Sequence, residues 1–239
     1  MQQTIERSRI MANQRNKTQS GFTLIELLAV MLLMAIITGI TIVGFTGVTR
    51  GAAASGAARN LQQTIKLARQ YAITQRIPVA FIIADQDLLT ANGLIATAES
   101  SNLISRAYAV YDLRHFKYLK AWTELPQTMV FMNGTLDELT GGMAGEGRHV
   151  LDLPRNIEQD IPFPYEHSPT YARFHGIIFG PDGKLLNTGG GWYFWVMAFE
   201  GGVDNDLIPF RRGAGRDIVY GIRVSYSGAA QMIELTMEL

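Results

Sequence analysis

The side chain whose setting most clearly demands a chemical role is Glu26, the only charge within the otherwise apolar residues 22–48. An isolated carboxylate in a membrane interior costs about 2.5–3.5 kcal/mol on insertion scales. Such a group therefore needs a partner of opposite charge or a way to reach water. One interpretation is that Glu26 pairs with a cation during assembly. The alternative is that it lies near the membrane surface and extends its carboxylate to the interface.

The other candidates for catalysis or metal binding lack the spacing that their chemistry requires. No serine stands in a G-x-S-x-G context, and the absence of cysteine excludes disulfides and thiolate metal sites. The Gly-rich residues 141–147 lack the Lys and Ser/Thr of a phosphate-binding loop. The histidines do not form an HExxH spacing, so we expect no enzyme activity, no cofactor and no metal site, and structural or surface roles for His115, His149, His167 and His175.

Two short polar clusters leave binding hypotheses open. Asp204 and Asp206 enclose Asn205 and offer the oxygen ligands that calcium prefers, although they lack the spacing of an EF-hand; a solvated turn is the alternative. The basic cluster could contact the phosphates of DNA, and it consists of Arg211, Arg212 and Arg216. The formal net charge of the chain is +0, so its overall charge does not favour nucleic-acid binding.

The elements that position Glu26 begin with a basic leader and an apolar segment. Residues 22–48 exceed the roughly 20 residues that a helix needs to cross a bilayer, and they are too long for the apolar core of a secretory signal peptide. The positive-inside rule places the N-terminus in the cytoplasm, because the leader carries Arg7, Arg9, Arg15 and Lys17 against Glu6 alone. On length and charge alone, an ordinary signal anchor is equally compatible.

The string Gly21-Phe22-Thr23-Leu24-Ile25-Glu26-Leu27 resembles the processing signal of the type IV pilin and type II secretion pseudopilin superfamily. The resemblance implies cleavage by prepilin peptidase between Gly21 and Phe22 and N-methylation of Phe22. It also implies that Glu26 pairs with the new amine of a neighbouring subunit as subunits dock, since each charge is costly alone in a medium of low dielectric constant. The implied partners are other pilins, the peptidase/methyltransferase and an inner-membrane assembly platform.

After the apolar segment, the pattern predicts one continuing helix and then strands. Residues 49–76 carry an apolar stripe at helical spacing, Leu61, Ile65, Ala68 and Ala72, and Pro78 predicts that the helix ends near Arg76. The remainder predicts strands near residues 79–84, 108–113, 118–122, 129–131, 174–179, 184–186, 192–199, 218–226 and 231–235. A long helix followed by antiparallel strands indicates an α+β fold, with a periplasmic domain over residues 77–239.

Segments of this second part resemble the H-type minor pseudopilins and their T-type minor pilin relatives. These segments are residues 67–81, 122–131, 177–189 and 222–235. The chain departs from that pattern at residues 133–170 and 201–216, which have the composition of insertions. The resemblance implies a minor subunit of a type II secretion pseudopilus or type IV pilus, held in the inner membrane with its C-terminal domain in the periplasm. The alternative is a minor pilin that binds DNA or another ligand for uptake or adhesion; for some relatives, calcium or DNA binding is also implied.

Overall fold

The structure is a computed structural model that describes residues 22–88, 98–142, 146–152, 157–186, 193–211 and 216–238. The side chains of residues 39–50, 98–99, 216–218 and 237–238 are outside this description. The predicted leader, residues 1–21, lies outside the described residues. Two compact units make up the chain, Met1–Val48 and Thr49–Leu239.

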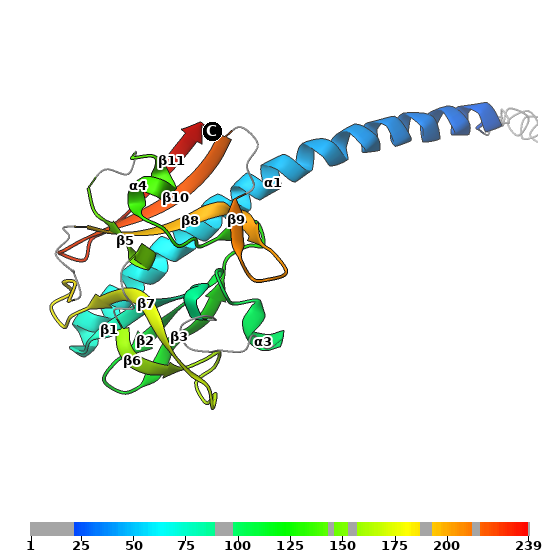
Figure 1. The fold of residues 1–239 in the computed structure, drawn as a ribbon. Coiled ribbons are helices and arrows are strands. Elements are labelled where there is room, and N and C mark those ends of the chain that lie inside the picture. The colour runs from blue at the N-terminus through cyan, green and yellow to red at the C-terminus, as the bar shows by residue number, and fades with distance from the viewer. Residues whose placement is uncertain are drawn as a thin grey trace, which may run out of the picture. The chain divides into compact units, whose positions relative to one another are not determined.

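The helix α1 covers Leu24–Gln75 and contributes to both units (Figure 1). It ends where the sequence predicts, because Arg76 adopts a left-handed backbone with φ 52°. The amide of Ile77 then donates a hydrogen bond of 3.3 Å to the carbonyl oxygen of Ala72. This is the closing hydrogen bond of a Schellman motif, and it satisfies a carbonyl that the end of the helix would otherwise leave free.

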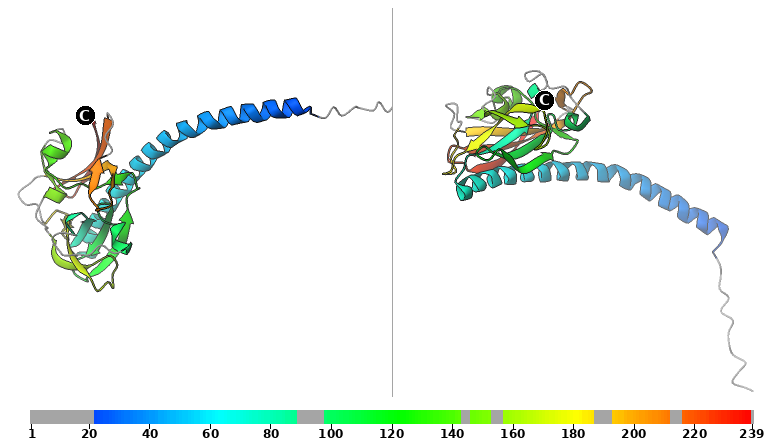
Figure 2. Two further views of the ribbon diagram at one scale, coloured as in Figure 1. Left: turned by 45° about the vertical axis from the view of Figure 1, so that its right-hand side comes forward. Right: turned by 90° about the horizontal axis from the view of Figure 1, so that it is seen from below.

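Two β-sheets form the rest of the second unit (Figures 1 and 2). The five-stranded sheet has the order β3-β2-β1-β7-β6 and is antiparallel. Its strands are β1 Val79–Ala84, β2 Ala107–Asp112, β3 Lys117–Glu124, β6 Ile157–Pro162 and β7 Tyr171–Phe179.

The six-stranded sheet has the order β11-β10-β8-β4, with β5 and β9 also paired to β8. Its strands are β4 Met129–Val130, β5 Arg148–His149, β8 Tyr193–Val203, β9 Pro209–Arg211, β10 Arg216–Ser225 and β11 Ala230–Glu238. All its pairings are antiparallel except that of β5 with β8, which is parallel. Three short helices complete the described elements: α3 Ala98–Ser101, α4 Leu136–Thr140 and the 3-10 helix η1 Val150–Asp152.

The main core of the second unit joins α1 to both sheets. The predicted stripe of Leu61, Ile65, Ala68 and Ala72 is fully buried, which confirms the helical pattern in the sequence. It belongs to one apolar cluster with side chains of β1, β7, β8 and β10. A second cluster covers the other face of the five-stranded sheet, and a third packs α4 against β8. The α+β class and the packing of the helix on antiparallel sheet are therefore confirmed.

Most predicted strands are found, with three corrections. The strand near residues 184–186 is reduced to one bridge between Phe179 and Leu185, because the amide of Leu185 donates to the carbonyl oxygen of Tyr226 at 3.0 Å. The described parts of residues 133–170 contain α4, β5, η1 and β6, and those of residues 201–216 contain β9, which are elements that the sequence pattern did not predict. Finally, the strands form two sheets, a division that residue patterns along the chain do not reveal.

Candidate functional site

The start of α1 is built around Thr23 and Glu26. The backbone amide of Thr23 donates to Oε2 of Glu26 at 3.0 Å, and the Thr23 hydroxyl donates to the same oxygen at 2.9 Å. The amide of Glu26 in turn approaches Oγ1 of Thr23 at 3.4 Å. This is a capping box, in which an N-cap Thr and a Glu three residues later satisfy each other's backbone amides. Glu26 thus has a local function within its own chain that the sequence interpretation did not include.

The first turns of α1 present apolar side chains in every direction. The large apolar side chains from Phe22 to Ile37 are 49–82 % exposed. A helix that is apolar all round requires an apolar environment, which is supplied by lipid or by other protein. Within this surface, the carboxylate of Glu26 is the charged group, and it faces the end of the helix at which Phe22 would carry a new amine after cleavage.

This arrangement suits charge pairing between chains. Oε2 of Glu26 accepts hydrogen bonds from Thr23, so the carboxylate is held in a defined position at the helix start. An ammonium group from another chain would find there an oriented acceptor in a setting of low dielectric constant, where a charge-assisted hydrogen bond is strongest. Gly21, the other half of the predicted cleavage site, lies outside the described residues.

No helical stretch among the described residues combines the length and the hydropathy of a bilayer span. The predicted span, residues 22–48, includes residues 39–48, whose side chains lie outside the description.

Of the three arginines predicted as DNA contacts, the structure describes the side chain of Arg211 alone. Arg211 donates from Nη2 to the carbonyl oxygen of Leu139 at 3.0 Å, and its guanidinium lies 4.8 Å from the ring centre of Phe199. This side chain thus links β9 to the end of α4 and to β8. Arg212 lies outside the described residues, and Arg216 is in β10 with its side chain undescribed. DNA contact by these arginines stays a prediction.

Asp204 closes the turn between β8 and β9. Its Oδ1 accepts hydrogen bonds from the backbone amides of Asp206, at 3.0 Å, and Ile208, at 2.8 Å. This use of an aspartate oxygen is typical of turns in which the side chain binds nearby backbone. The geometry explains the cluster without an ion, while calcium binding by Asp204 and Asp206 stays a prediction.

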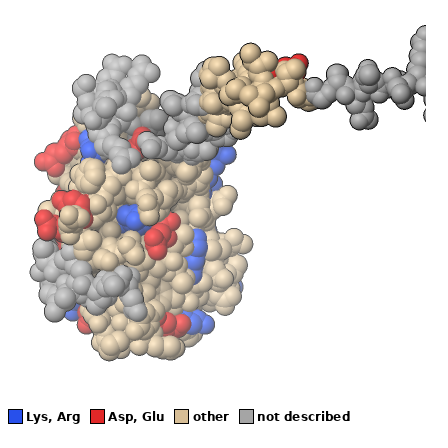
Figure 3. Space-filling model, turned by 90° about the vertical axis from the view of Figure 1, so that its right-hand side faces the viewer, with Lys and Arg blue, Asp and Glu red and all other residues tan. Residues whose placement is uncertain are grey.

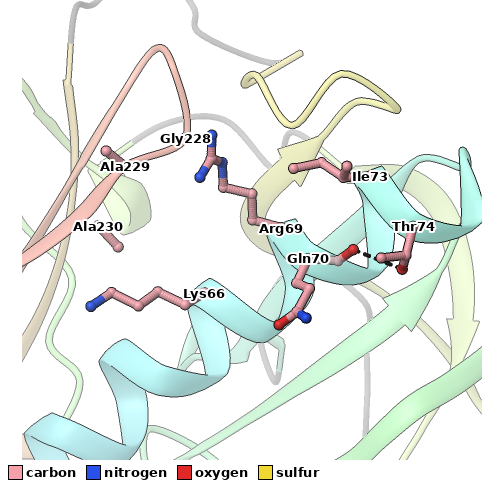
Figure 4. A pocket seen from close by; sticks show the side chains of 8 residues that line it. All are labelled: Lys66, Arg69, Gln70, Ile73, Thr74, Gly228, Ala229 and Ala230. Carbon is pink, nitrogen blue, oxygen red and sulfur yellow. Dashed lines mark hydrogen bonds between the residues drawn. The ribbon is translucent and has the colours of Figure 1, made fainter.

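An open groove of about 440 Å³ runs beside the second part of α1 (Figure 4). It is lined by Lys66, Arg69, Gln70, Ile73 and Thr74 of the helix and by residues 228–230 at the turn between β10 and β11. Arg69 donates from Nε to the carbonyl oxygen of Gly183 at 3.1 Å. The groove is therefore the seam at which the helix meets the 180–183 turn and the β10–β11 turn.

Charged side chains of both signs are interspersed on the described part of the face in Figure 3. That part of the surface thus presents no field of one sign that would attract a polyanion.

Two of the four histidines are exposed and two are buried, although the sequence led to the same expectation of a structural or surface role for all four. His115 and His167 are exposed, whereas His149 and His175 are buried. Burial lowers the pKa of His149 to about 4, and the neighbouring His175 acts in the same direction. A hydrogen bond with the backbone of Gly134 acts in the opposite direction and limits the lowering of this pKa.

The sequence interpretation missed the pairing of His175 with Asp85. Nδ1 of His175 lies 3.0 Å from Oδ2 of Asp85, and both side chains are almost completely buried. The sequence did contain a sign that these two residues are unusual, because each is a polar residue beside an apolar strand segment. Asp85 directly follows β1, and His175 lies within the apolar part of β7. Nothing in the sequence indicated that these two residues meet across the sheet.

One comparison with known proteins gives a match. Residues 16–42 match the prokaryotic N-terminal methylation motif, which is the signal of type IV pilins and pseudopilins and indicates prepilin processing. Among curated proteins and among solved structures, nothing matches the chain. The resemblance to a pilin-type precursor is thereby confirmed at its N-terminal signal, whereas the H-type or T-type minor subfamily stays a prediction.

Proposed function

We propose that this chain is a structural subunit, of the minor type, of a type II secretion pseudopilus or type IV pilus. Prepilin peptidase removes residues 1–21 and the new N-terminal Phe22 is methylated. The apolar helix first holds the subunit in the inner membrane, with the N-terminus in the cytoplasm and the β-rich unit in the periplasm. The same helix then packs against the helices of other subunits in the filament, and the chain has no catalytic role of its own.

The observation that carries this proposal is the methylation motif on residues 16–42. Two features support it. The helix that follows the motif exposes apolar side chains on all sides from Phe22 to Ile37, as a segment must if lipid and later other helices surround it. The capping box holds the Glu26 carboxylate at the helix start, where it can receive the amine that cleavage creates.

The capping box also suggests how assembly proceeds. Before docking, Oε2 of Glu26 is satisfied by the amide and hydroxyl of Thr23, so the lone carboxylate does not stay unpartnered in an apolar setting. On docking, the amine of the adjacent subunit binds the same carboxylate and fixes the axial register of the two helices. Thr23 thus keeps the carboxylate stable and oriented until its ionic partner arrives.

The processing step is tested by expressing the full chain with and without prepilin peptidase and measuring the intact mass. The expected product begins at Phe22 and carries one methyl group. A Gly21→Val variant is expected to stay uncut, because the added side chain keeps the peptidase from approaching the backbone. A wild-type chain that still begins at Met1 in its native host would overturn the proposal.

The assembly step is tested by two variants that separate capping from charge. Glu26→Gln retains a capping side chain, since Gln also serves at this position of a capping box, but it removes the charge. Thr23→Val removes the cap and keeps the charge. We expect both precursors to be cut, Glu26→Gln to lose its place in the filament and Thr23→Val to enter it less efficiently, as measured by recovery in sheared filaments. Normal assembly of Glu26→Gln would contradict a role for ionic pairing.

The choice between the two filament types is tested in a strain that lacks the chain. Loss of exoprotein secretion with normal surface fibres would favour the pseudopilus, and the reverse would favour the pilus. Complementation with Glu26→Gln serves as the matched control, because it should fail in either case.

A further inference from the structure

Three side chains that are distant in sequence converge inside the second unit. Asp85 follows β1, Asp87 lies two residues further, and His175 is in β7 opposite Ile83. One ligand atom from each lies within 4.8 Å of the others, and among the described residues this is the one group of three His, Asp or Glu side chains so close together. The two carboxylates come from one end of a strand, and the imidazole comes from its neighbour in the sheet.

One buried oxygen of this group has no hydrogen-bond partner. Asp85 is 1 % exposed and His175 is 3 % exposed. Oδ2 of Asp85 pairs with Nδ1 of His175, whereas Oδ1 of Asp85 has no hydrogen-bond partner. A buried carboxylate oxygen without a partner is costly, and a cation at this position would satisfy it.

The described residues contain a second Asp–His pair, in which both carboxylate oxygens have hydrogen-bond partners. Nδ1 of His115 lies 2.7 Å from Oδ2 of Asp112. In contrast to Asp85, the other oxygen of Asp112 is also satisfied, because it accepts the amides of Arg114 at 2.8 Å and His115 at 3.0 Å. The pair at Asp112 closes a turn and is complete, whereas the pair at Asp85 leaves an acceptor unused.

We propose that Asp85, Asp87 and His175 bind a divalent transition-metal ion of the zinc type. An imidazole nitrogen with two carboxylate oxygens is a ligand set that zinc accepts, whereas calcium prefers oxygen ligands alone. The proposal departs from the sequence-based expectation that the chain holds no metal, and it does not depend on the proposed filament function.

The required adjustment is small. Zinc ligands at about 2.1 Å from the ion lie about 3.4 Å apart in a tetrahedral site. The ligand atoms of the group lie at most 4.8 Å apart, so the widest separation has to close by about 1.4 Å at most. Asp87 is only half-buried, so its side chain can rotate to do so. The ion would join the end of β1 to β7 through these three ligands, with its fourth position left to water, and would stabilise the folded chain as a crosslink.

The experiment uses the full chain in detergent micelles, stripped with a chelator and then dialysed against zinc alone. We expect one zinc ion per chain by elemental analysis and a higher Tm in the presence of zinc. His175→Gln and Asp87→Asn each remove a direct ligand and are expected to weaken zinc binding by more than the roughly tenfold that the loss of an outer-shell partner costs. Asp87→Asn is the more informative variant, because Asp87 is half-buried and its replacement is compatible with folding.

The matched control is His115→Gln, which alters the other Asp–His pair and should leave zinc binding unchanged. Equal zinc binding by wild type, His175→Gln and Asp87→Asn would overturn the site, as would the absence of stoichiometric zinc in the wild type. A parallel dialysis against calcium alone tests the type of ion: calcium binding that is lost in Asp87→Asn but kept in His175→Gln would overturn the assignment to a transition metal.

Discussion

The two parts of α1, residues 22–38 and residues 49–75, differ in whether their apolar side chains are buried within the chain. In residues 22–38 the large apolar side chains point in all directions and are exposed. In residues 49–75 the buried positions recur at helical spacing, from Ala54 and Ala58 to Leu61, Ile65, Ala68 and Ala72. The large apolar side chains of residues 22–38 are exposed, whereas the buried side chains of the second part pack in one core with the two sheets.

This difference separates two kinds of stability. The second part belongs to the folding equilibrium of the β-rich unit, because its stripe forms the main core. The first part contributes through whatever apolar environment surrounds it, so its energetics are those of insertion and helix association. Substitutions of the same chemistry should therefore have different consequences in the two parts.

The largest expected effect comes from truncating the buried stripe. Ile65→Ala should lower the free energy of unfolding by about 2–5 kcal/mol, because Ile65 is fully buried and the loss leaves a cavity. Ile36→Ala is the matched control: its side chain is 53 % exposed, so the unfolding of the β-rich unit should be unchanged. The measurement is urea unfolding of the full chain in micelles, followed by the fluorescence of buried Trp195.

Equal destabilisation by the two variants would mean that residues 22–38 are part of the same cooperative core as residues 49–75. Reduced filament recovery of Ile36→Ala with unchanged unfolding would support separate roles for the two parts of α1.

Acid pH should destabilise the β-rich unit through His149. The folded pKa is about 4 because burial disfavours the charged ring, whereas an unfolded histidine titrates near about 6.5. The contribution to stability is thus complete above about pH 6.5 and is lost as the pH falls toward about 4, by about 3 kcal/mol in total. The measurement is the free energy of unfolding as a function of pH in wild type and His149→Leu.

The variant should lack this component of the pH dependence, whatever its absolute stability. His167→Gln is the control, because His167 is exposed and its replacement should leave the curve unchanged. The apolar segment 22–48 contains no histidine, so the pH effect should be confined to the second unit. A wild-type curve that is flat between about pH 6.5 and 4 would contradict a buried neutral His149.

The smallest expected effect is a gain in stability from Gly56→Ala. A Cβ at this exposed helical position would have no atom within 4 Å, and alanine favours a helix over glycine by about 1 kcal/mol. The same substitution at Gly228 should destabilise, because its φ is +80° and a Cβ would collide with the carbonyl oxygen of Gly183. Urea midpoints of the two variants against wild type provide the measurement, and a loss of stability in Gly56→Ala would contradict the exposed placement of that helix face.

Local patterns predicted most single elements. The spacing of Leu61, Ile65, Ala68 and Ala72 predicted the buried face of α1, and the apolar run at residues 79–84 predicted β1 with its bounds. Both depend on a periodicity that short-range geometry imposes on any helix or strand. The strand β6 was missed because its alternating residues include Glu158 and Asp160 and stand among turn residues, so its edge position in the sheet concealed it.

The candidate sites divide in the same way. The string around Glu26 identified the processing signal, since its residues are adjacent and the motif is read in the unfolded chain. The capping box at Thr23 was also within reach of the sequence, as Thr and Glu stand three residues apart. The pairing of Asp85 with His175 was out of reach, because ninety positions separate the two residues and their contact depends on the register of β1 against β7.

Neighbouring residues were enough to predict the basic leader, the apolar segment with its one carboxylate, the start and end of α1, and the strands with clear alternation. Each of these follows from neighbouring residues and from the geometry of a helix, a strand or a membrane. Three features became visible in the folded chain alone. The strands form two sheets around one helix face, and Arg69 donates a hydrogen bond to the carbonyl oxygen of Gly183. Asp85, Asp87 and His175 lie close together. Those outcomes depend on which distant segments pack together, and packing is set by the whole core at once rather than by local preference.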